Sequence, residues 1–196
     1  TWNTLISGYV KHGQGHEALH CYEMMQNEGF SPVNVTYICV LKACGKTCNV
    51  DKGIQIHKEI VTKGLLKSEL MIGNALIDMY CRCGKVSEAQ VLFDDLPHED
   101  VDTWNILIGG YADFGLAEDA LKCIELMQLE GMFPDPNFYA CAMKACISME
   151  ATNAGHGLHK DIVKCGYEDH AQIGNMLINL YAKLGSVPDM QQLFNS

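Results

Sequence analysis

The stretch TWNTLISGY at residues 1–9 occurs again as TWNILIGGY at residues 103–111, 102 positions further along the chain. The similarity continues over most of the sequence, from EALHCYEMMQNEGFSP against DALKCIELMQLEGMFP to IGNALIDMYCRCG against IGNMLINLYAKLG. One module of about a hundred residues is therefore present twice. Repetition at a nearly constant offset is typical of repeat architectures, in which neighbouring units stack on one another.

Each copy of this stretch has the spacing of an amphipathic helix. Its apolar residues fall at i, i+3, i+4 and i+7, which is one face of a helix. In the two copies they are Trp2, Leu5, Ile6, Tyr9 and Trp104, Leu107, Ile108, Tyr111. A second amphipathic stretch follows and ends at Gly29 or Gly131, with a proline three residues later. A glycine just past a helix and a proline soon afterwards form a stop signal, so the pattern predicts a hairpin of two helices.

The chain divides into six such hairpins in a single array. They cover residues 1–33, 34–69, 70–100, 101–135, 136–170 and 171–196, the last being truncated. One hairpin cannot bury its apolar face alone, so the expected fold is all-α, a right-handed α-solenoid (superhelix) of stacked antiparallel helix-turn-helix hairpins. Because the chain starts abruptly at Thr1, we expect a piece of a longer protein. Its end hairpins lack polar capping helices, so self-association through the terminal repeats is a further expectation.

Composition argues against binding that is driven by phosphate contacts. The formal net charge is −10, and the 14 basic residues include one arginine, Arg82. Affinity for nucleic-acid phosphates comes from neutralising many of them at once, so no DNA partner is expected. A protein that recognises bases by hydrogen bonds and packing remains possible. No run of about 18 apolar residues occurs, so no membrane contact is expected either.

The ten cysteines follow the repeat and are expected to be free thiols. Three pairs lie 102 residues apart, namely Cys21 and Cys123, Cys39 and Cys141, and Cys44 and Cys146. Copies of a repeat position among apolar residues indicate buried thiols of a reducing compartment rather than a disulfide framework. Metal binding is the alternative, but no CxxC pair occurs, and the Cys81-Arg-Cys83 stretch has no matching second pair. We therefore expect no metal and no other cofactor.

The hairpins resemble pentatricopeptide repeats of the plant type in which P, L and S repeats alternate. TWNTLISGY…G…EAL…M…G…P resembles the P repeat, YICVLKAC…GIQIHKEIVTKG the L repeat, and IGNALIDMYCRCGKVSEAQVLFDDLP the S repeat. The order is then P-L-S-P-L-S over essentially the whole chain. The complete second, third and fourth units have 36, 31 and 35 residues, whereas a tetratricopeptide array, the nearest rival, keeps a steady period of about 34.

This resemblance implies a protein that binds single-stranded RNA in a chloroplast or mitochondrion, with one base per repeat. In the family, an Asn, Thr or Ser early in the first helix reads the base together with the last residue of the same repeat. The early residues here are Asn3, Ile38, Asn74, Asn105, Ala140 and Asn175. The last residues of the first five repeats are Val33, Glu69, Asp100, Asp135 and His170.

Two repeats carry the combination that the family uses for pyrimidines, uracil first and cytosine second. They pair Asn74 with Asp100 and Asn105 with Asp135, and we expect them to read adjacent pyrimidines. An Asn amide offers a donor and an acceptor to a base edge, whereas an Asp carboxylate accepts, directly or through water. The remaining combination, Asn3 with Val33, departs from the pattern and is assigned no base.

The family also holds each base between apolar residues near the start of the repeats. Val35 and Met71 fit that role. The later repeats have Asp102, Asn137 and Gln172 in this place, which weakens the expectation there. The apolar Ile38 and Ala140 of the two L repeats cannot hydrogen-bond a base edge, so these repeats are expected to provide spacing or contacts with a partner.

Simpler structural roles compete with some of these assignments. Asp100 and Asp135 precede helices, so each is also a candidate N-cap, a role that is compatible with base contact. His57 and His159 are copies of one repeat position, and we expect them to be packed or partly exposed rather than to act as ligand or base. Nucleotide-binding and hydrolase motifs and the H-x-E…P-C-x-x-C signature of zinc deaminases do not occur, so no enzyme is expected.

Two functions follow from the sequence. The first is a sequence-specific RNA-binding segment of an organellar RNA-editing (C-to-U) specificity factor, which would place a deaminase next to one cytidine. The alternative is a protein-interaction scaffold whose L repeats bind small editing cofactors, the multiple organellar RNA editing factors. The net charge of −10 and the apolar L-repeat positions suit the second function.

Overall fold

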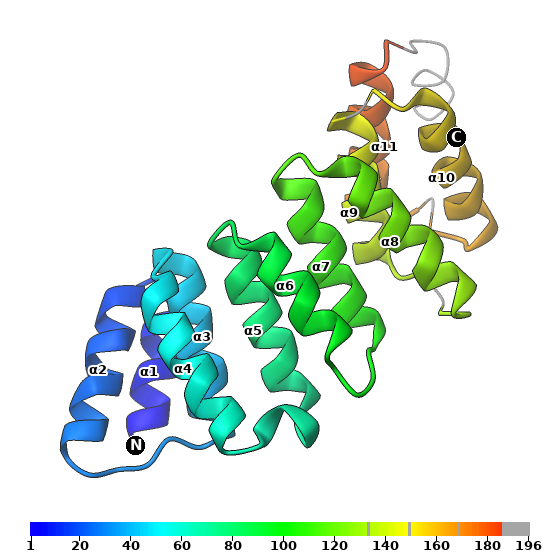
Figure 1. Cartoon of the computed structure of the whole chain (residues 1–196). Helices are drawn as coiled ribbons and strands as arrows, with labels where there is room; N and C mark the ends of the chain where they lie inside the picture. The colour runs from blue at the N-terminus through cyan, green and yellow to red at the C-terminus, as the bar shows by residue number, and fades with distance from the viewer. Residues whose placement is uncertain (133, 149, 168, 186–196) are drawn as a thin grey trace. The chain divides into compact units, whose positions relative to one another are not determined.

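The structure, a computed structural model, describes residues 1–132, 134–148, 150–167 and 169–185 (Figure 1). Eleven α-helices and one 3-10 helix lie in this part of the chain, and it contains no strand. Two compact units divide the chain, Thr1–Leu107 and Ile108–Ser196, and the boundary falls within one helix.

The first unit contains three pairs of helices and the start of a seventh helix. Its elements are α1 (Trp2–Lys11), α2 (Gly15–Asn27), α3 (Asn34–Thr47), α4 (Val50–Thr62), η1 (Leu65–Lys67), α5 (Leu70–Arg82), α6 (Val86–Asp94) and α7 (Val101–Asp113). The first helices of successive pairs contact each other, α1 with α3 and α3 with α5. Helices α2 and α4 each pack between their own partner and the first helix of the next pair. Each apolar face is thereby covered by the following hairpin.

The second unit repeats this arrangement. It contains the rest of α7, followed by α8 (Ala117–Leu129), α9 (Pro136–Ser148), α10 (Thr152–Lys164) and α11 (Ala171–Lys183). Helix α9 contacts α8, α10 and α11. The rest of the 171–196 repeat, from residue 186 onward, lies outside the described residues. Stacked helical hairpins are therefore present in each unit, as the repeat predicts, whereas the division into P, L and S repeats stays a prediction.

The turns inside the hairpins have the same geometry in both copies of the module. Gly13 and Gly115 have φ of 77° and 71°, a left-handed conformation that glycine adopts easily because it has no Cβ. The second hairpin of each copy uses a non-glycine residue instead, since Cys48 and Glu150 have φ of 52° and 53°. These two residues are 102 positions apart, so the left-handed turn belongs to the repeat position and not to one side chain.

Burial differs between the two copies of the opening stretch. Trp104 is 3% exposed and packs edge-to-face on Phe93 of α6, with ring centroids 4.7 Å apart. Its copy Trp2 stays partly exposed. Leu107 is fully buried, whereas its copy Leu5 is 46% exposed. The exposed face of α1 is the surface that the expected self-association would use, and that association stays a prediction.

All ten cysteines are free thiols, as the repeat spacing predicts. Cys44 and Cys146 are fully buried, and Cys21 and Cys123 are nearly so. Cys39 and Cys141 are partly exposed, so the prediction of buried thiols is confirmed for two of the three repeated pairs. Burial raises the pKa of the Cys44 thiol to about 12 and that of Cys146 to about 11, so both stay protonated and unreactive at neutral pH.

The repeated histidines are packed residues, which confirms the structural interpretation of this position. His57 Nδ1 lies 2.8 Å from the Tyr80 hydroxyl, and His159 Nδ1 lies 2.7 Å from the Tyr181 hydroxyl. Each contact joins the second helix of one hairpin to the first helix of the next. Burial lowers the pKa of His57, which favours its neutral form in the folded protein.

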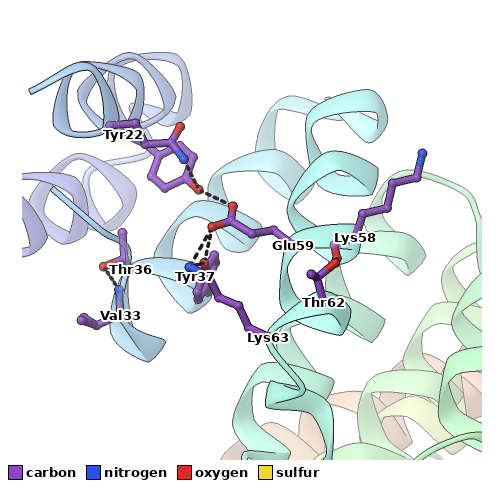
Figure 2. A network of polar contacts seen from close by, with 9 residues as sticks. Tyr22, Val33, Thr36, Tyr37, Lys58, Glu59, Thr62 and Lys63 are labelled. Atoms are coloured by element: carbon purple, nitrogen blue, oxygen red, sulfur yellow. Dashed lines mark hydrogen bonds and ion pairs between the residues drawn. The ribbon is translucent and has the colours of Figure 1, made fainter. Parts of the chain in front are cut away.

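A polar network joins α2, α3 and α4 around the carboxylate of Glu59 (Figure 2). Glu59 accepts hydrogen bonds from the hydroxyls of Tyr37, at 2.6 Å, and Tyr22, at 3.4 Å. Lys63 lies 2.9 Å from Glu59 and donates to the Tyr37 hydroxyl at 2.7 Å. Burial by itself would raise the pKa of Glu59, but the hydrogen bonds from Tyr37 and Lys63 outweigh it and lower the pKa. The ionised carboxylate therefore stabilises this joint.

The second copy of the module replaces this network. Lys63 corresponds to Cys165 and Glu59 to the shorter Asp161. The retained tyrosine, Tyr139, lies 3.4 Å from the Cys165 sulfur. The charged network is therefore specific to the first copy.

We expect Glu59→Gln to lower the free energy of unfolding by about 1–2 kcal/mol at neutral pH, because hydrogen bonds to a charged acceptor are lost. Since the pKa of Glu59 is lowered in the folded state, this contribution is present above its ordinary pKa of about 4.3 and disappears as the pH falls through the lowered value. Urea unfolding across pH 2–7 measures it. Glu125→Gln, at an exposed position of α8, is the control, and equal effects of the two variants would contradict the assignment.

Candidate nucleic-acid interface

The early residues selected from the sequence share one structural position. Asn74 is the fifth residue of α5, and Ile38, Asn105, Ala140 and Asn175 are the fifth residues of α3, α7, α9 and α11. Asn3 is the second residue of α1, which begins at Trp2. Helix residues three apart lie on the same face. The second residue of each helix, such as Met71 in α5, therefore lies beside the fifth.

Large apolar side chains are exposed beside this position in the first unit. Val33, Val35 and Met71 are 52%, 55% and 68% exposed. A flat ring can pack against an exposed apolar side chain of this kind. The corresponding residues Asp102, Asn137 and Gln172 are also exposed, but they are polar.

The fifth residues differ in how far they reach the surface. Asn3, Ile38 and Asn74 are partly exposed, and Asn175 is exposed. Asn105 is 9% exposed and Ala140 is 8% exposed. Asn74 is therefore a more accessible candidate reader than Asn105.

Asn74 and Asp100 are brought together by a third residue, Thr103. The Asn74 Nδ2 lies 3.4 Å from Asp100 Oδ1. Thr103 comes from the start of the next hairpin, and its hydroxyl lies 2.8 Å from Asn74 Oδ1 and 2.7 Å from Asp100 Oδ1. Asn74, near the start of the 70–100 repeat, and Asp100, at its end, thus both contact a residue of the following repeat.

Asp100 and Thr103 also form a reciprocal cap at the start of α7. The Thr103 backbone N–H donates to Asp100 Oδ1 at 2.8 Å, and the Asp100 backbone N–H donates to the Thr103 hydroxyl at 3.2 Å. Partial burial by itself would raise the pKa of Asp100, but the bonds from Thr103 and Asn74 outweigh it and lower the pKa. The side chain is therefore an acceptor at neutral pH.

A similar contact exists two hairpins earlier, between α1 and α3. The Thr36 hydroxyl donates to Asn3 Oδ1 at 2.7 Å and accepts the Val33 backbone N–H at 3.1 Å (Figure 2 shows Val33 and Thr36). Thr36 and Thr103 are both the third residue of their helices. Val33 has no side-chain oxygen, so the Asn3–Val33 pair lacks the acceptor that Asp100 provides in the Asn74–Asp100 pair.

Asp135 caps α9 but lies in the second unit. Its Oδ1 accepts the Phe138 backbone N–H at 2.7 Å. Asn105 belongs to the first unit, so the two residues of this pair lie in different units. Glu69 and His170 precede α5 and α11 without a side-chain capping bond. The capping role is thus confirmed for Asp100 and Asp135, and their base contact stays a prediction.

Sequence reasoning did not find Thr36 and Thr103. The sequence does contain a pattern that indicates Thr103, because an Asp followed three residues later by a Thr at a helix start is typical of a helix cap. The contact to Asn74 has no such signal, since it joins residues 29 positions apart.

Much of the basic charge is already neutralised within the protein. Arg82 is paired with Asp78 one turn earlier, with both carboxylate oxygens at 2.9 Å. Lys52, Lys63, Lys85, Lys122, Lys144 and Lys164 are also within ion-pair distance of carboxylates. These paired side chains are therefore less available to neutralise phosphates.

The described part of the chain shows neither a metal-binding cluster nor a membrane-spanning helix. It contains no group of three or more His, Cys, Asp or Glu side chains placed to hold a metal ion. No described helix has the length and apolar character needed to cross a membrane.

The fold and this row of positions define a helical-repeat protein. The profile described as the PPR repeat family matches residues 1–46, and profiles described as PPR repeat match residues 35–65, 74–97, 102–132 and 175–196. The chain belongs to the pentatricopeptide repeat family.

Relatives in Arabidopsis thaliana agree with this assignment. A mitochondrial pentatricopeptide repeat-containing protein is 32% identical over 195 residues, which are 100% of this chain and 19% of the relative. A chloroplastic one is 36% identical over 186 residues, which are 95% of this chain and 34% of the relative. The chain thus spans between about a fifth and a third of the length of these relatives.

Solved structures confirm the all-α solenoid fold. The pentatricopeptide repeat protein PPR10 from maize matches 100% of this chain and 28% of its own, with a TM-score of 0.74 and 22% identity. PPR10 in complex with an 18-nt psaJ RNA element matches 100% of this chain and 34% of its own, with a TM-score of 0.55 and 20% identity. The nuclear proteinaceous RNase P 2 from A. thaliana matches 92% of this chain and 41% of its own, with a TM-score of 0.63 and 10% identity. At these identities the likeness shows the fold alone.

We expect Asp100→Ala to lower the free energy of unfolding by about 1–2 kcal/mol, because α7 loses its cap and the Thr103 hydroxyl loses an acceptor. Since the pKa of Asp100 is lowered in the folded state, the loss is full above its ordinary pKa of about 3.9 and shrinks as the pH falls through the lowered value. Asp102→Ala, two residues away and exposed, is the control. Urea unfolding at pH 7 and pH 3 measures both variants, and a pH-independent loss at Asp100 would contradict an ionised cap.

Proposed function

We propose that the chain binds single-stranded RNA and reads individual bases with the residues at the starts and ends of its repeats. The arrangement that carries this proposal is the cluster of Asn74, Asp100 and Thr103, with the exposed Met71 one turn before Asn74. The complex of PPR10 with an RNA element supports it, because that protein shares the fold and binds RNA.

The chemistry of the cluster suits a pyrimidine. The amide nitrogen of Asn74 donates a hydrogen bond, and the ionised Asp100 accepts one, directly or through water. Uracil presents the O4 acceptor beside its N3–H donor, so both partners are satisfied. The exposed Met71 packs against the face of the ring, as the base-holding residues of the family do. Asn105 with Asp135 is proposed as the reader of the adjacent pyrimidine.

The other repeats contribute less to base reading. Asn3 with Val33 offers an amide without an acidic partner, and no partner is assigned to Asn175. The 34–69 and 136–170 repeats have Ile38 and Ala140 in the reading position, so they serve as spacers or partner contacts.

The biological role that we propose is that of a specificity factor in organellar C-to-U RNA editing. Its support is the alternation of repeats of 36, 31 and 35 residues, interpreted as a P-L-S order. The similarity to mitochondrial and chloroplastic proteins supports an organellar location. In this role the chain supplies the address on the RNA, and a deaminase supplies the reaction, so this segment itself is not an enzyme.

A second candidate function is supported by the apolar surface at the start of α3. Val33 and Val35 are more than half exposed, and Ile38 follows Val35 by one turn. Such a patch suits a protein partner, and the multiple organellar RNA editing factors are the candidates. A gel-shift assay with and without such a factor separates the two functions. Binding of RNA only in its presence would mean that both apply.

RNA binding is tested with the full chain and short single-stranded RNAs that differ at two adjacent positions, UU against AA. We expect weak binding with a preference for UU of about tenfold and a shallow salt dependence, because few phosphates are contacted. Asn74→Ala should remove most of the preference, whereas Asn153→Ala, at an exposed position of α10, should leave it intact. Fluorescence anisotropy at two salt concentrations gives these affinities. A wild-type chain that binds both RNAs equally would rule out base reading.

A further inference from the structure

The hydroxyl of Thr103 has a second contact that capping does not explain. The cap consists of the two backbone bonds between Asp100 and Thr103, at 2.8 and 3.2 Å, and the hydroxyl also lies 2.7 Å from Asp100 Oδ1. The same hydroxyl also lies 2.8 Å from Oδ1 of Asn74, which is in the preceding hairpin. Thr36 makes the equivalent bond to Asn3, at 2.7 Å, although Val33 cannot provide the side-chain half of a cap there. The bond between the threonine and the asparagine is therefore separable from capping.

The orientation of the Asn74 amide follows from its two neighbours. Asp100 is ionised and can only accept, so the amide atom that faces it at 3.4 Å is the NH2 group. The amide oxygen then faces the Thr103 hydroxyl at 2.8 Å. The single proton of that hydroxyl lies between two acceptors, this amide oxygen and Asp100 Oδ1 at 2.7 Å, and is shared by them. The reverse orientation would place the amide oxygen against a carboxylate and its NH2 group against the hydroxyl. Of the two protons on Nδ2, one is directed towards Asp100, and the other has no acceptor among the described residues.

We propose that Thr103 is a positioning residue for Asn74, because its hydroxyl holds the amide so that an N–H, and not the carbonyl oxygen, is presented to the bound base. This inference rests on the proposed function. It assigns part of the reader of one repeat to the first helix of the next repeat. Among the described first helices that follow another hairpin, α5, α9 and α11 have Ile72, Phe138 and Ile173 as third residues, which carry no hydroxyl. The device is therefore found at the starts of α3 and α7.

The fixed amide determines which pyrimidine is preferred. An N–H donor can hydrogen-bond to the O4 acceptor of uracil. It cannot hydrogen-bond to the exocyclic amine of cytosine, because that amine is also a donor. If the amide were free to turn, its oxygen would accept from that amine and cytosine would bind as well. The Thr103 hydroxyl therefore raises the affinity for uracil relative to cytosine, and it does so without touching the base.

The test compares Thr103→Val and Thr103→Ser in the full chain by two measurements. The first is the NMR signal pair of the Asn74 side-chain amide in the free protein, assigned by its loss in Asn74→Ala. The second is the ratio of affinities for RNAs with U or C at the position that faces this repeat. Thr62→Val removes a hydroxyl on α4 that bonds to a backbone carbonyl in its own helix, and it serves as the control.

We expect Thr103→Val to shift the amide signals, to speed their hydrogen exchange and to lower the U:C ratio by about fivefold, a typical effect of one hydrogen bond. Thr103→Ser should restore both, and Thr62→Val should change neither. A purely structural role would lower stability and leave the ratio unchanged, so a lower ratio with rescue by serine supports positioning. Unchanged amide signals in Thr103→Val, or an altered amide with an unchanged ratio, overturn it.

The same measurements separate this inference from the function on which it rests. If the wild-type chain shows no base preference while Thr103→Val still alters the amide, base reading fails and the hydrogen bond stands as a structural contact only. If the wild-type chain prefers uracil and Thr103→Val has the same U:C ratio, base reading stands and the role of Thr103 is rejected.

Discussion

Each hairpin of this protein must bury one apolar face against the next hairpin, and the rest of the structure depends on that requirement. Phe93 packing on Trp104, and the histidine–tyrosine contacts that recur in the two units, are the places where it is met. A joint of this kind brings the start of one repeat onto the end of the previous one. Side chains that are far apart in sequence therefore meet at these joints.

The candidate reading site is a product of such a joint. Asn74 comes from one hairpin and Thr103 from the following one, and Asp100 lies between them as the cap of α7. One carboxylate thus stabilises a helix start and supplies an acceptor at the surface. Because the cap holds Asp100 in place before any ligand arrives, a base that binds there does not have to order it.

The two copies of the module keep the packing and vary the polar contacts. The left-handed turns at Cys48 and Glu150 are the same in both, since they are required for the hairpin to close. The network around Glu59 exists in the first copy alone, because Cys165 and Asp161 cannot reproduce it in the second. Stability and recognition can therefore change in one repeat while the stack is preserved.

The sequence by itself determined the helices, the hairpins and the duplicated module, because apolar spacing and helix-stop residues act locally and repeat. It also determined that Asn74, Asp100, Val33, Val35 and Met71 are surface candidates, through the repeat register. Only the tertiary structure decided that Thr103 and Thr36 contact the asparagines, that Asn105 is largely buried, and that Trp2 and Leu5 are less buried than their copies. These properties depend on which hairpin covers which face, and residues separated by about 30 positions meet only when the hairpins stack.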